Sequence, residues 1–138
     1  MAFEGIQTKL GWYVASTAFG TTDQYCGVFL STATNAEPDV RIRITSGERI
    51  AGILDDLGSE SSGSAVGIVV YGVTKFRFSS THAAIAVMDP LYTRSDGTFN
   101  NASSSSFYPA GYALDALAAD TSGIISGFVS PSLSNRAT

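Results

Sequence analysis

The sequence predicts an all-β protein: a single-domain β-sandwich or barrel of short antiparallel strands, with an N-terminal arm and a weak internal duplication. Three observations support this. Turn-forming residues recur about every eight to twelve positions. The segments between them are short and rich in β-branched and aromatic residues. Two segments also share a residue spacing that fits strands better than helices. At 138 residues the chain is long enough for one domain with its own core.

The first strands are expected at residues 12–16 and 25–30, where apolar residues cluster between turn-forming ones. Residues 1–11 show no clear period, and we expect residues 1–13 to form an N-terminal arm. A β domain at 14–130 and a C-terminal tail at 131–138 would follow.

The segment VRIRI, which begins at Val40, alternates between apolar residues and the cations Arg41 and Arg43. This two-residue period is typical of a strand with one buried face. Residues 65–73, AVGIVVYGV, are apolar almost without interruption and rich in β-branched residues. Such a run indicates a central strand.

The alternation resumes after this run, with Phe76 and Phe78 on one face and Lys75 and Arg77 on the other. Five of the eight basic residues lie between positions 41 and 77. Two interpretations are open: a positive strip that meets an acidic partner surface, and an ordinary solvated strand face. The solvated face is the favoured interpretation.

The stretch MDPLYTRSDGTF, residues 88–99, contains two aspartates. Whether they act as catalytic groups or as turn residues decides whether enzyme activity is expected. Asp89 precedes Pro90, a pair that commonly starts a turn. Asp96-Gly97 predicts a two-residue hairpin turn of type I′, in which both central residues take a positive φ. A calcium loop would need further carboxylates that SDG does not supply. We therefore assign all four residues to structural turns.

Residues 54–70 and 114–130 align without gaps at an offset of 60 and share seven identical positions, including Asp55 with Asp115. The second copy, rich in Ala and Leu, would pass for a helix on its own. The first copy carries Gly58 and follows Gly52, which makes it a poor helix. Shared spacing suggests shared conformation, so we predict strand, turn, strand in both.

The charge content is low, at 14%, and the formal net charge is −4. Binding to nucleic acid needs many basic residues, and the chain has only eight Lys and Arg, so nucleic acid is not an expected partner. No apolar stretch approaches the roughly 18 residues of a membrane span, so no membrane partner is expected. The N-terminal sequence lacks the regions of a signal peptide, and the single cysteine fits a reducing compartment. A surface with few charged side chains also loses little hydration free energy when it is covered in an assembly.

No catalytic or cofactor-binding motif is present. His82 is the sole histidine, which excludes zinc sites built on histidine pairs, and we expect it on the surface. Cys26 lies in an apolar pattern without a basic neighbour in sequence, so a structural cysteine is expected. Neither a G-x-S-x-G elbow nor a glycine-rich phosphate loop occurs. We expect no enzyme activity, no cofactor and no metal.

The order of three segments resembles the capsid decoration (cement) proteins of tailed bacteriophages. These segments are VGIVVYGVTKFRF, AAIAVMDPLYTRSDGTF and PAGYALDALAADTSGIISGFV, and the resemblance covers about residues 24–129. The YGVTK, DPLY and SDG motifs are each weak but together moderately specific. Met88 departs from the pattern, because the family usually has Gly there, and the Ser-rich loop at 102–106 is an elaboration.

The resemblance implies a β-rich protein of the virion, made in the host cytoplasm, that oligomerises, often as a homotrimer, on the outer capsid surface. It implies the major capsid protein as partner, capsid stabilisation as function, and no catalytic residues. The candidate contacts are the apolar residues of the N-terminal stretch and the basic strip: Phe3, Ile6, Trp12, Tyr13, Arg41, Arg43, Lys75 and Arg77.

Two other functions remain open from the sequence. One is a carbohydrate-binding β-sandwich on a virion or cell surface, in which Trp12 and tyrosines stack on sugars. The other is a small β-barrel hydrolase that uses Asp55 and Asp89 as an acid–base pair.

Overall fold

The computed structural model describes residues 7–30, 39–42, 49–55, 59–102 and 108–131. Phe3, Ile6, Arg43, the side chain of Trp12 and the tail from residue 132 lie outside this description. The described part contains nine strands and a short 3-10 helix, η1 (Thr21–Asp23). The strands are β1 (Gln7–Ala15), β2 (Gly27–Leu30), β3 (Asp39–Arg41), β4 (Ile50–Leu54), β5 (Ala65–Phe78), β6 (Pro90–Thr93), β7 (Phe99–Asn100), β8 (Pro109–Ala113) and β9 (Gly123–Val129).

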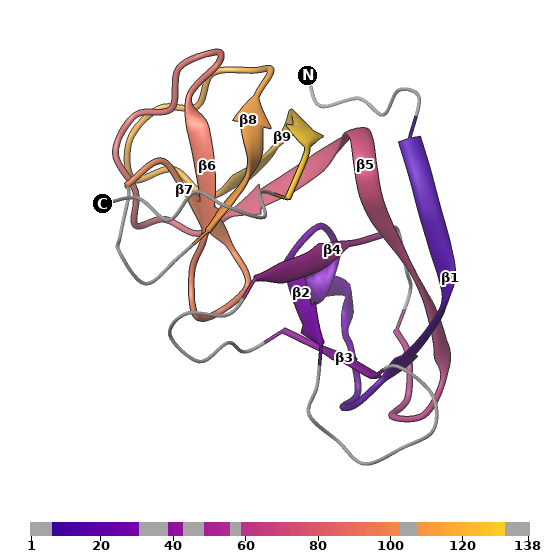
Figure 1. Cartoon of the computed structure of the whole chain (residues 1–138). Helices are drawn as coiled ribbons and strands as arrows, with labels where there is room; N and C mark the ends of the chain where they lie inside the picture. Colours follow the sequence, from indigo (N-terminus) through magenta and orange to yellow (C-terminus); the bar gives the residue numbers. More distant parts are fainter. Residues whose placement is uncertain (1–6, 31–38, 43–48, 56–58, 103–107, 132–138) are drawn as a thin grey trace.

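The strands confirm the all-β prediction and decide in favour of a barrel. Strands β1, β3, β2, β4 and β5 follow one another in the sheet, and β1 pairs back onto β5, which closes a five-stranded barrel. The sheet then continues from β5 through β9, β8 and β6 to β7 (Figure 1). One pair, β1 with β3, is parallel, and the other strand pairs are antiparallel.

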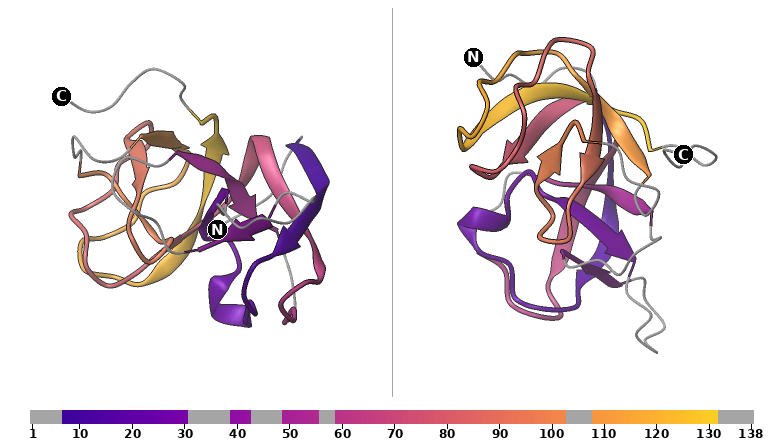
Figure 2. Two further views of the ribbon diagram at one scale, coloured as in Figure 1. Left: turned by 60° about the horizontal axis from the view of Figure 1, so that its bottom comes forward. Right: turned by 90° about the vertical axis from the view of Figure 1, so that its left-hand side faces the viewer.

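Strand β5 joins the barrel to the second sheet. Its first half pairs with β1 and β4, and its second half pairs with β9. The change occurs at Gly72, which is the register partner of both Gln7 in β1 and Val129 in β9. Gly72 has φ +109°, a conformation that glycine adopts without steric cost. In the left-hand view of Figure 2 the barrel and the second sheet occupy separate halves connected by β5.

The middle of the apolar run of β5, around Ile68 and Val69, is buried on both faces because two cores adjoin it, whereas Ala65 and Tyr71 are exposed. Ile68 belongs to the barrel interior with Val28 and Leu54. Val69, the next residue, belongs to a larger core between the barrel and the second sheet. Alternate side chains of β5 thus enter different cores, which explains the unbroken apolar sequence. The central-strand prediction is confirmed.

The aromatic residues of the alternating segment 75–78 enter the larger core. Phe76 and Phe78 are buried, whereas Lys75 and Arg77 are half-buried on the other face. Phe99 from β7 packs edge-on against Phe76, with 4.7 Å between ring centroids. These contacts hold β7 against β5 across the core.

Each copy of the duplicated segment ends in a strand, as predicted, but the first strand of the predicted strand, turn, strand lies almost wholly before the copy. Strand β4 contributes only Leu54 to the first copy, and β8 ends at Ala113, just before the second. The first copy includes the end of β4 and the start of β5, and the second lies between β8 and the end of β9; each strand pair is antiparallel. The helix suggested by ALDALAAD does not form, because its backbone groups pair elsewhere. Leu114 N donates to Ser126 O at 2.9 Å, and Leu117 exchanges two backbone hydrogen bonds with Ile85.

Strand β1 begins at Gln7, so the arm boundary expected at residue 13 falls inside a strand. The ladder between β1 and β5 has register shifts after Thr8 and between Leu10 and Tyr13. Each shift interrupts the two-residue alternation. The strand consequently has no regular period that the sequence could display.

The hairpin of β6 and β7 forms where predicted, but its turn is not type I′. Gly97 N donates to Arg94 O at 2.9 Å, and Arg94 N donates to Thr98 O at 2.7 Å. Gly97 has φ +84°, whereas Asp96 is not among the residues with positive φ. This is a longer loop that ends in a glycine bulge, so the type I′ prediction is wrong. Asp96 instead accepts hydrogen bonds from Thr98 N and Oγ1.

Candidate functional site

A pocket of about 420 Å³ lies where the hairpin tip meets the barrel. The tip is fixed by a hydrogen bond from Gly27 N to Gly97 O at 2.8 Å. The pocket is lined by the segment before η1, the end of β3 and one residue of the hairpin: Thr17, Ala18, Phe19, Asp23, Arg41, Ile42 and Asp96. It thus contains two of the residues selected from the sequence, Arg41 and Asp96.

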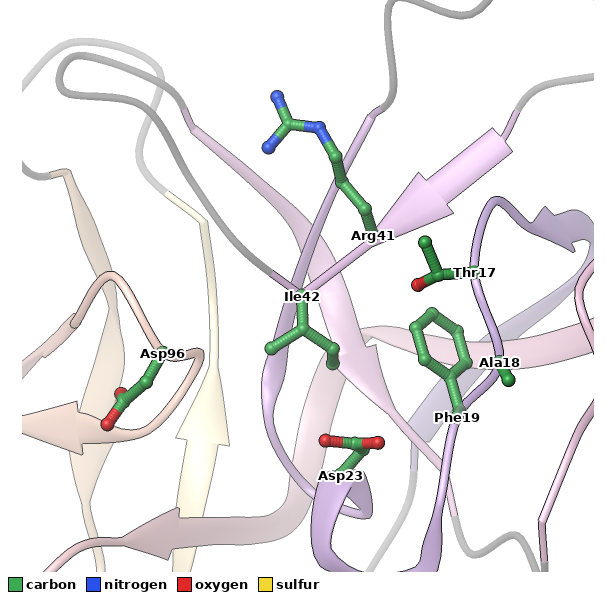
Figure 3. Close-up of a pocket in the computed structure, with 7 residues that line it drawn as sticks. All are labelled: Thr17, Ala18, Phe19, Asp23, Arg41, Ile42 and Asp96. Carbon is green, nitrogen blue, oxygen red and sulfur yellow. The ribbon is translucent and has the colours of Figure 1, made fainter.

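The charged groups of the pocket do not converge on one point. Figure 3 shows Asp96 to the left of Ile42 and Asp23 below it, with the Arg41 guanidinium directed away from both. Each carboxylate also holds its own turn. Asp23 Oδ2 accepts from Gly20 N at 2.7 Å, and Asp96 Oδ1 accepts from Thr98 Oγ1 at 2.6 Å. The two carboxylates of the pocket are therefore not arranged as an acid–base pair.

Two members of the expected basic strip are engaged within the molecule. Arg77 donates from Nε to Gln24 O at 2.7 Å and from Nη2 to Thr21 O at 3.3 Å. The Lys75 ammonium lies 5.0 Å from the centroid of the Tyr25 ring and 3.4 Å from its hydroxyl oxygen. Both side chains therefore hold the segment around η1. Arg41 lies apart from them, on β3 in the pocket wall.

Asp89 closes the turn that precedes β6. Its Oδ2 accepts from Ala86 N and from Asn101 Nδ2, both at 2.9 Å, and its own N–H donates to Ala86 O. The hydrogen bond from Ala86, followed by the one from Asn101, lowers the pKa of the Asp89 carboxyl below its ordinary value. Met88, within this turn, has φ +72°. That is the position where the decoration-protein pattern has Gly.

His82 is buried, with 7% of its surface exposed, which contradicts the surface location expected from the sequence. Its Nε2 lies 2.8 Å from Thr121 O and its Nδ1 2.6 Å from Ala83 O, while the ring packs edge-on against Phe78. The ring thus links the loop after β5 to the loop before β9. The polar sequence around it gave no indication of these loop contacts.

Cys26 is buried, as its apolar sequence context predicted. Burial raises the pKa of its thiol to about 12, although the nearby charge of Arg77 acts in the opposite direction. A thiol with this pKa is not a nucleophile near neutral pH. The proximity of Arg77 was not visible in the sequence, because 51 positions separate the two residues.

Within the described ranges, no group of three or more His, Cys, Asp or Glu side chains is placed to hold a metal ion. No helix in that part of the chain is long and apolar enough to cross a membrane.

The fold has a counterpart among solved structures. The chain is similar to the crystal structure of the head fiber gp8.5 N base of bacteriophage phi29, with a TM-score of 0.60. The similarity covers 94% of this chain and 100% of that one, at 14% sequence identity. At this identity the likeness establishes a shared fold. No protein-family model and no curated protein matches the sequence.

Proposed function

We propose that this chain is a structural protein of a phage virion, which binds the outer surface of the assembled capsid and stabilises contacts between major capsid protein subunits. The observation that carries the proposal is the fold shared with a phage head fiber base over nearly the whole of both chains. The order of the YGVTK, DPLY and SDG motifs supports it independently, because it points to proteins of the same viral surface.

The chemistry of the chain supports a binding role rather than catalysis. The carboxylates of the pocket serve turns, and the cysteine has a raised pKa. Low charge favours burial in an assembly, because few ions lose their hydration. In an oligomer such as a homotrimer, several shallow contacts act together. The second contact then forms at a high effective concentration, which strengthens attachment without a deep individual site.

The structure changes which candidate contacts are worth testing first. Lys75 and Arg77 have internal partners, so their loss would disturb the fold as well as any interface. Arg41 remains a direct candidate, because it lines the open pocket. Phe3 and Ile6 precede β1 and remain candidates as an apolar N-terminal segment, with Trp12 and Tyr13 inside the strand.

The proposal is tested by co-sedimentation with capsids assembled from the major capsid protein encoded in the same genome. We expect saturable binding at a fixed ratio to capsid subunits, and a higher melting temperature of the loaded capsids. Deletion of residues 1–6 removes Phe3 and Ile6 but leaves β1 intact, whereas deletion of 1–13 would remove most of a barrel strand. Absence of saturable binding by the full chain would refute the proposal.

A further inference from the structure

Two neighbouring loops of the second sheet are joined by a β-bridge. Residues 79–89 connect β5 to β6, and residues 114–122 connect β8 to β9. Ile85 and Leu117 exchange two backbone hydrogen bonds, at 2.8 and 3.0 Å, and both side chains pack on the larger core. Since successive side chains of an extended chain point in opposite directions, the residues that flank Ile85 and Leu117 point outward. The bridge therefore gives the two loops a common outer surface.

The outer surface of these loops is apolar. Val87 is 55% exposed and Met88 is 62% exposed, and they are two of the four strongly exposed large hydrophobic residues in the described part of the chain. Exposed alanines of both loops extend this surface: Ala83, Ala84, Ala86, Ala116, Ala118 and Ala119. Contiguous exposed apolar surface marks an interaction site, whereas single exposed residues do not. We call Val87, Met88 and these alanines the loop face.

The side chain of Met88 serves neither the turn nor the core. Its φ of +72° is strained for a residue with a Cβ, whereas glycine adopts this conformation freely. The turn is held by other groups, since the Asp89 carboxylate accepts from Ala86 N and from Asn101 Nδ2, and Met88 N donates to Ala113 O. A strained residue that presents a large apolar side chain to the outside is typical of a contact residue.

Negative charge borders the loop face. Residues 79–93 and 109–131 contain three aspartates, at positions 89, 115 and 120, and neither lysine nor arginine. Asp89 and Asp115 accept hydrogen bonds from neutral donors, which do not cancel their charge, and Asp120 is exposed. An apolar surface with a negative border is complementary to an apolar surface with a positive border.

The same charges disfavour other partners. Two copies that met through their loop faces would bring like charges together, and the phosphates of nucleic acid would be repelled. Arg94 donates to Thr81 O and Ser79 Oγ, so its positive charge lies near the start of the first loop and not among the three aspartates. Within the proposed function, the complementary partner is the major capsid protein.

We propose that the chain binds the capsid through the loop face, which docks on an apolar patch of the major capsid protein bordered by lysine or arginine. This inference rests on the proposed function and names the contact surface and the chemistry of the partner. The side chains of Val87 and Met88 enter the capsid surface. The alanines have short side chains, which let both loops approach it closely.

The test measures capsid binding by three glycine variants of the full chain. Met88→Gly and Val87→Gly each remove a side chain of the loop face, and Leu30→Gly removes one that is 52% exposed on β2 of the barrel. Co-sedimentation with capsids assembled from the major capsid protein of the same genome gives the dissociation constants. We expect Met88→Gly and Val87→Gly to weaken binding by about 10-fold or more, the loss for one buried apolar side chain. Leu30→Gly should bind like wild type.

The two loop-face variants should differ in stability, which separates binding from folding. Met88→Gly relieves a strained backbone and should unfold at a higher temperature than wild type, whereas Val87→Gly should unfold at a lower one. Loss of affinity in both cannot then be an effect of stability. Full affinity of folded Met88→Gly and Val87→Gly overturns the inference and leaves the proposed function standing. Absence of binding by wild type refutes the proposed function itself.

Asp120→Asn tests the charge assigned to the capsid surface. Asparagine tolerates the positive φ of this residue, +53°, and removes one negative charge. We expect binding about 2- to 5-fold weaker at low salt, with a difference that shrinks as salt is added. Unchanged or tighter binding overturns the positive border. Sedimentation equilibrium without capsids covers the remaining alternative. If Met88→Gly lowers the molar mass of an oligomer but keeps its capsid affinity, the loop face joins copies of the chain and the inference is wrong.

Discussion

The backbone N–H of Gly27 donates to the carbonyl oxygen of Gly97 at 2.8 Å, and this hydrogen bond fastens the β6–β7 hairpin to the barrel. The two residues are 70 positions apart. A Cβ at Gly97 would lie 2.5 Å from Ile42 Cγ2, and the residue has φ +84°. Asp96-Gly97 is therefore a turn that also serves as a docking point, and the pocket lies beside it.

Gly97→Ala is expected to destabilise the protein by about 2 to 4 kcal/mol, from the cost of a left-handed backbone plus a steric clash. Urea unfolding measures the loss. Gly63→Ala is the matched control, because Gly63 has φ +86° but nothing lies within 4 Å of an added Cβ. Gly63→Ala should lower the free energy of unfolding only by the cost of the left-handed backbone, about 1 to 2 kcal/mol. Equal losses in the two variants would show that the hairpin tip is not packed as described.

Met88→Gly is expected to raise the free energy of unfolding by about 0.5 to 1 kcal/mol. Relief of the left-handed backbone, φ +72°, should outweigh the greater freedom that glycine gains in the unfolded chain. Val87→Gly, an adjacent exposed position without positive φ, serves as control and should be destabilising. Chemical denaturation measures both. A loss of stability in Met88→Gly would contradict the strain assigned to this turn.

Asp89→Asn is expected to change how stability depends on pH. Because hydrogen bonds from Ala86 and Asn101 lower the pKa of Asp89 in the folded state, its contribution is complete above the unfolded value of 3.8. The contribution is lost as the pH falls through the lower folded pKa. The difference in unfolding free energy between wild type and Asp89→Asn should thus shrink below about pH 4. A difference that is constant from neutral to strongly acidic pH would refute the assignment.

Arg77→Met is expected to destabilise the protein by about 1 to 3 kcal/mol, because Gln24 O and Thr21 O lose charged donors. Arg77→Lys keeps the charge but not the two-donor geometry, so its loss should be intermediate. Thermal unfolding measures both. If Arg77→Met folds with full stability yet fails to bind capsids, Arg77 is an interface residue after all.

The sequence predicted those strands whose residues alternate between apolar and polar or form an unbroken apolar run. The alternation at 75–78 identified the buried Phe76 and Phe78, and the apolar run at 65–73 identified the central strand. The internal duplication corrected a helical propensity in the second copy, because the glycines of the first copy forbade a helix. At these positions the local conformational preference of the sequence agrees with the strands of the fold.

Features that depend on pairing between distant segments were not predictable. The irregular register of β1 removed the period that would have identified a strand before residue 12. The burial of His82 depends on a loop that is 39 positions away in sequence. The hydrogen bonds of Arg77 likewise depend on backbone carbonyl groups of the segment around η1. The stacking of Tyr112 on Phe128 also depends on register, because the two residues pair across β8 and β9.

The proposed role as a structural protein on the outside of a phage capsid is tested by quantitative co-sedimentation. The purified chain is mixed with capsids assembled from the major capsid protein of the same genome. We expect saturation at a fixed number of copies per capsid, and capsids that melt at a higher temperature. A folded chain that stays in the supernatant at every concentration would contradict it.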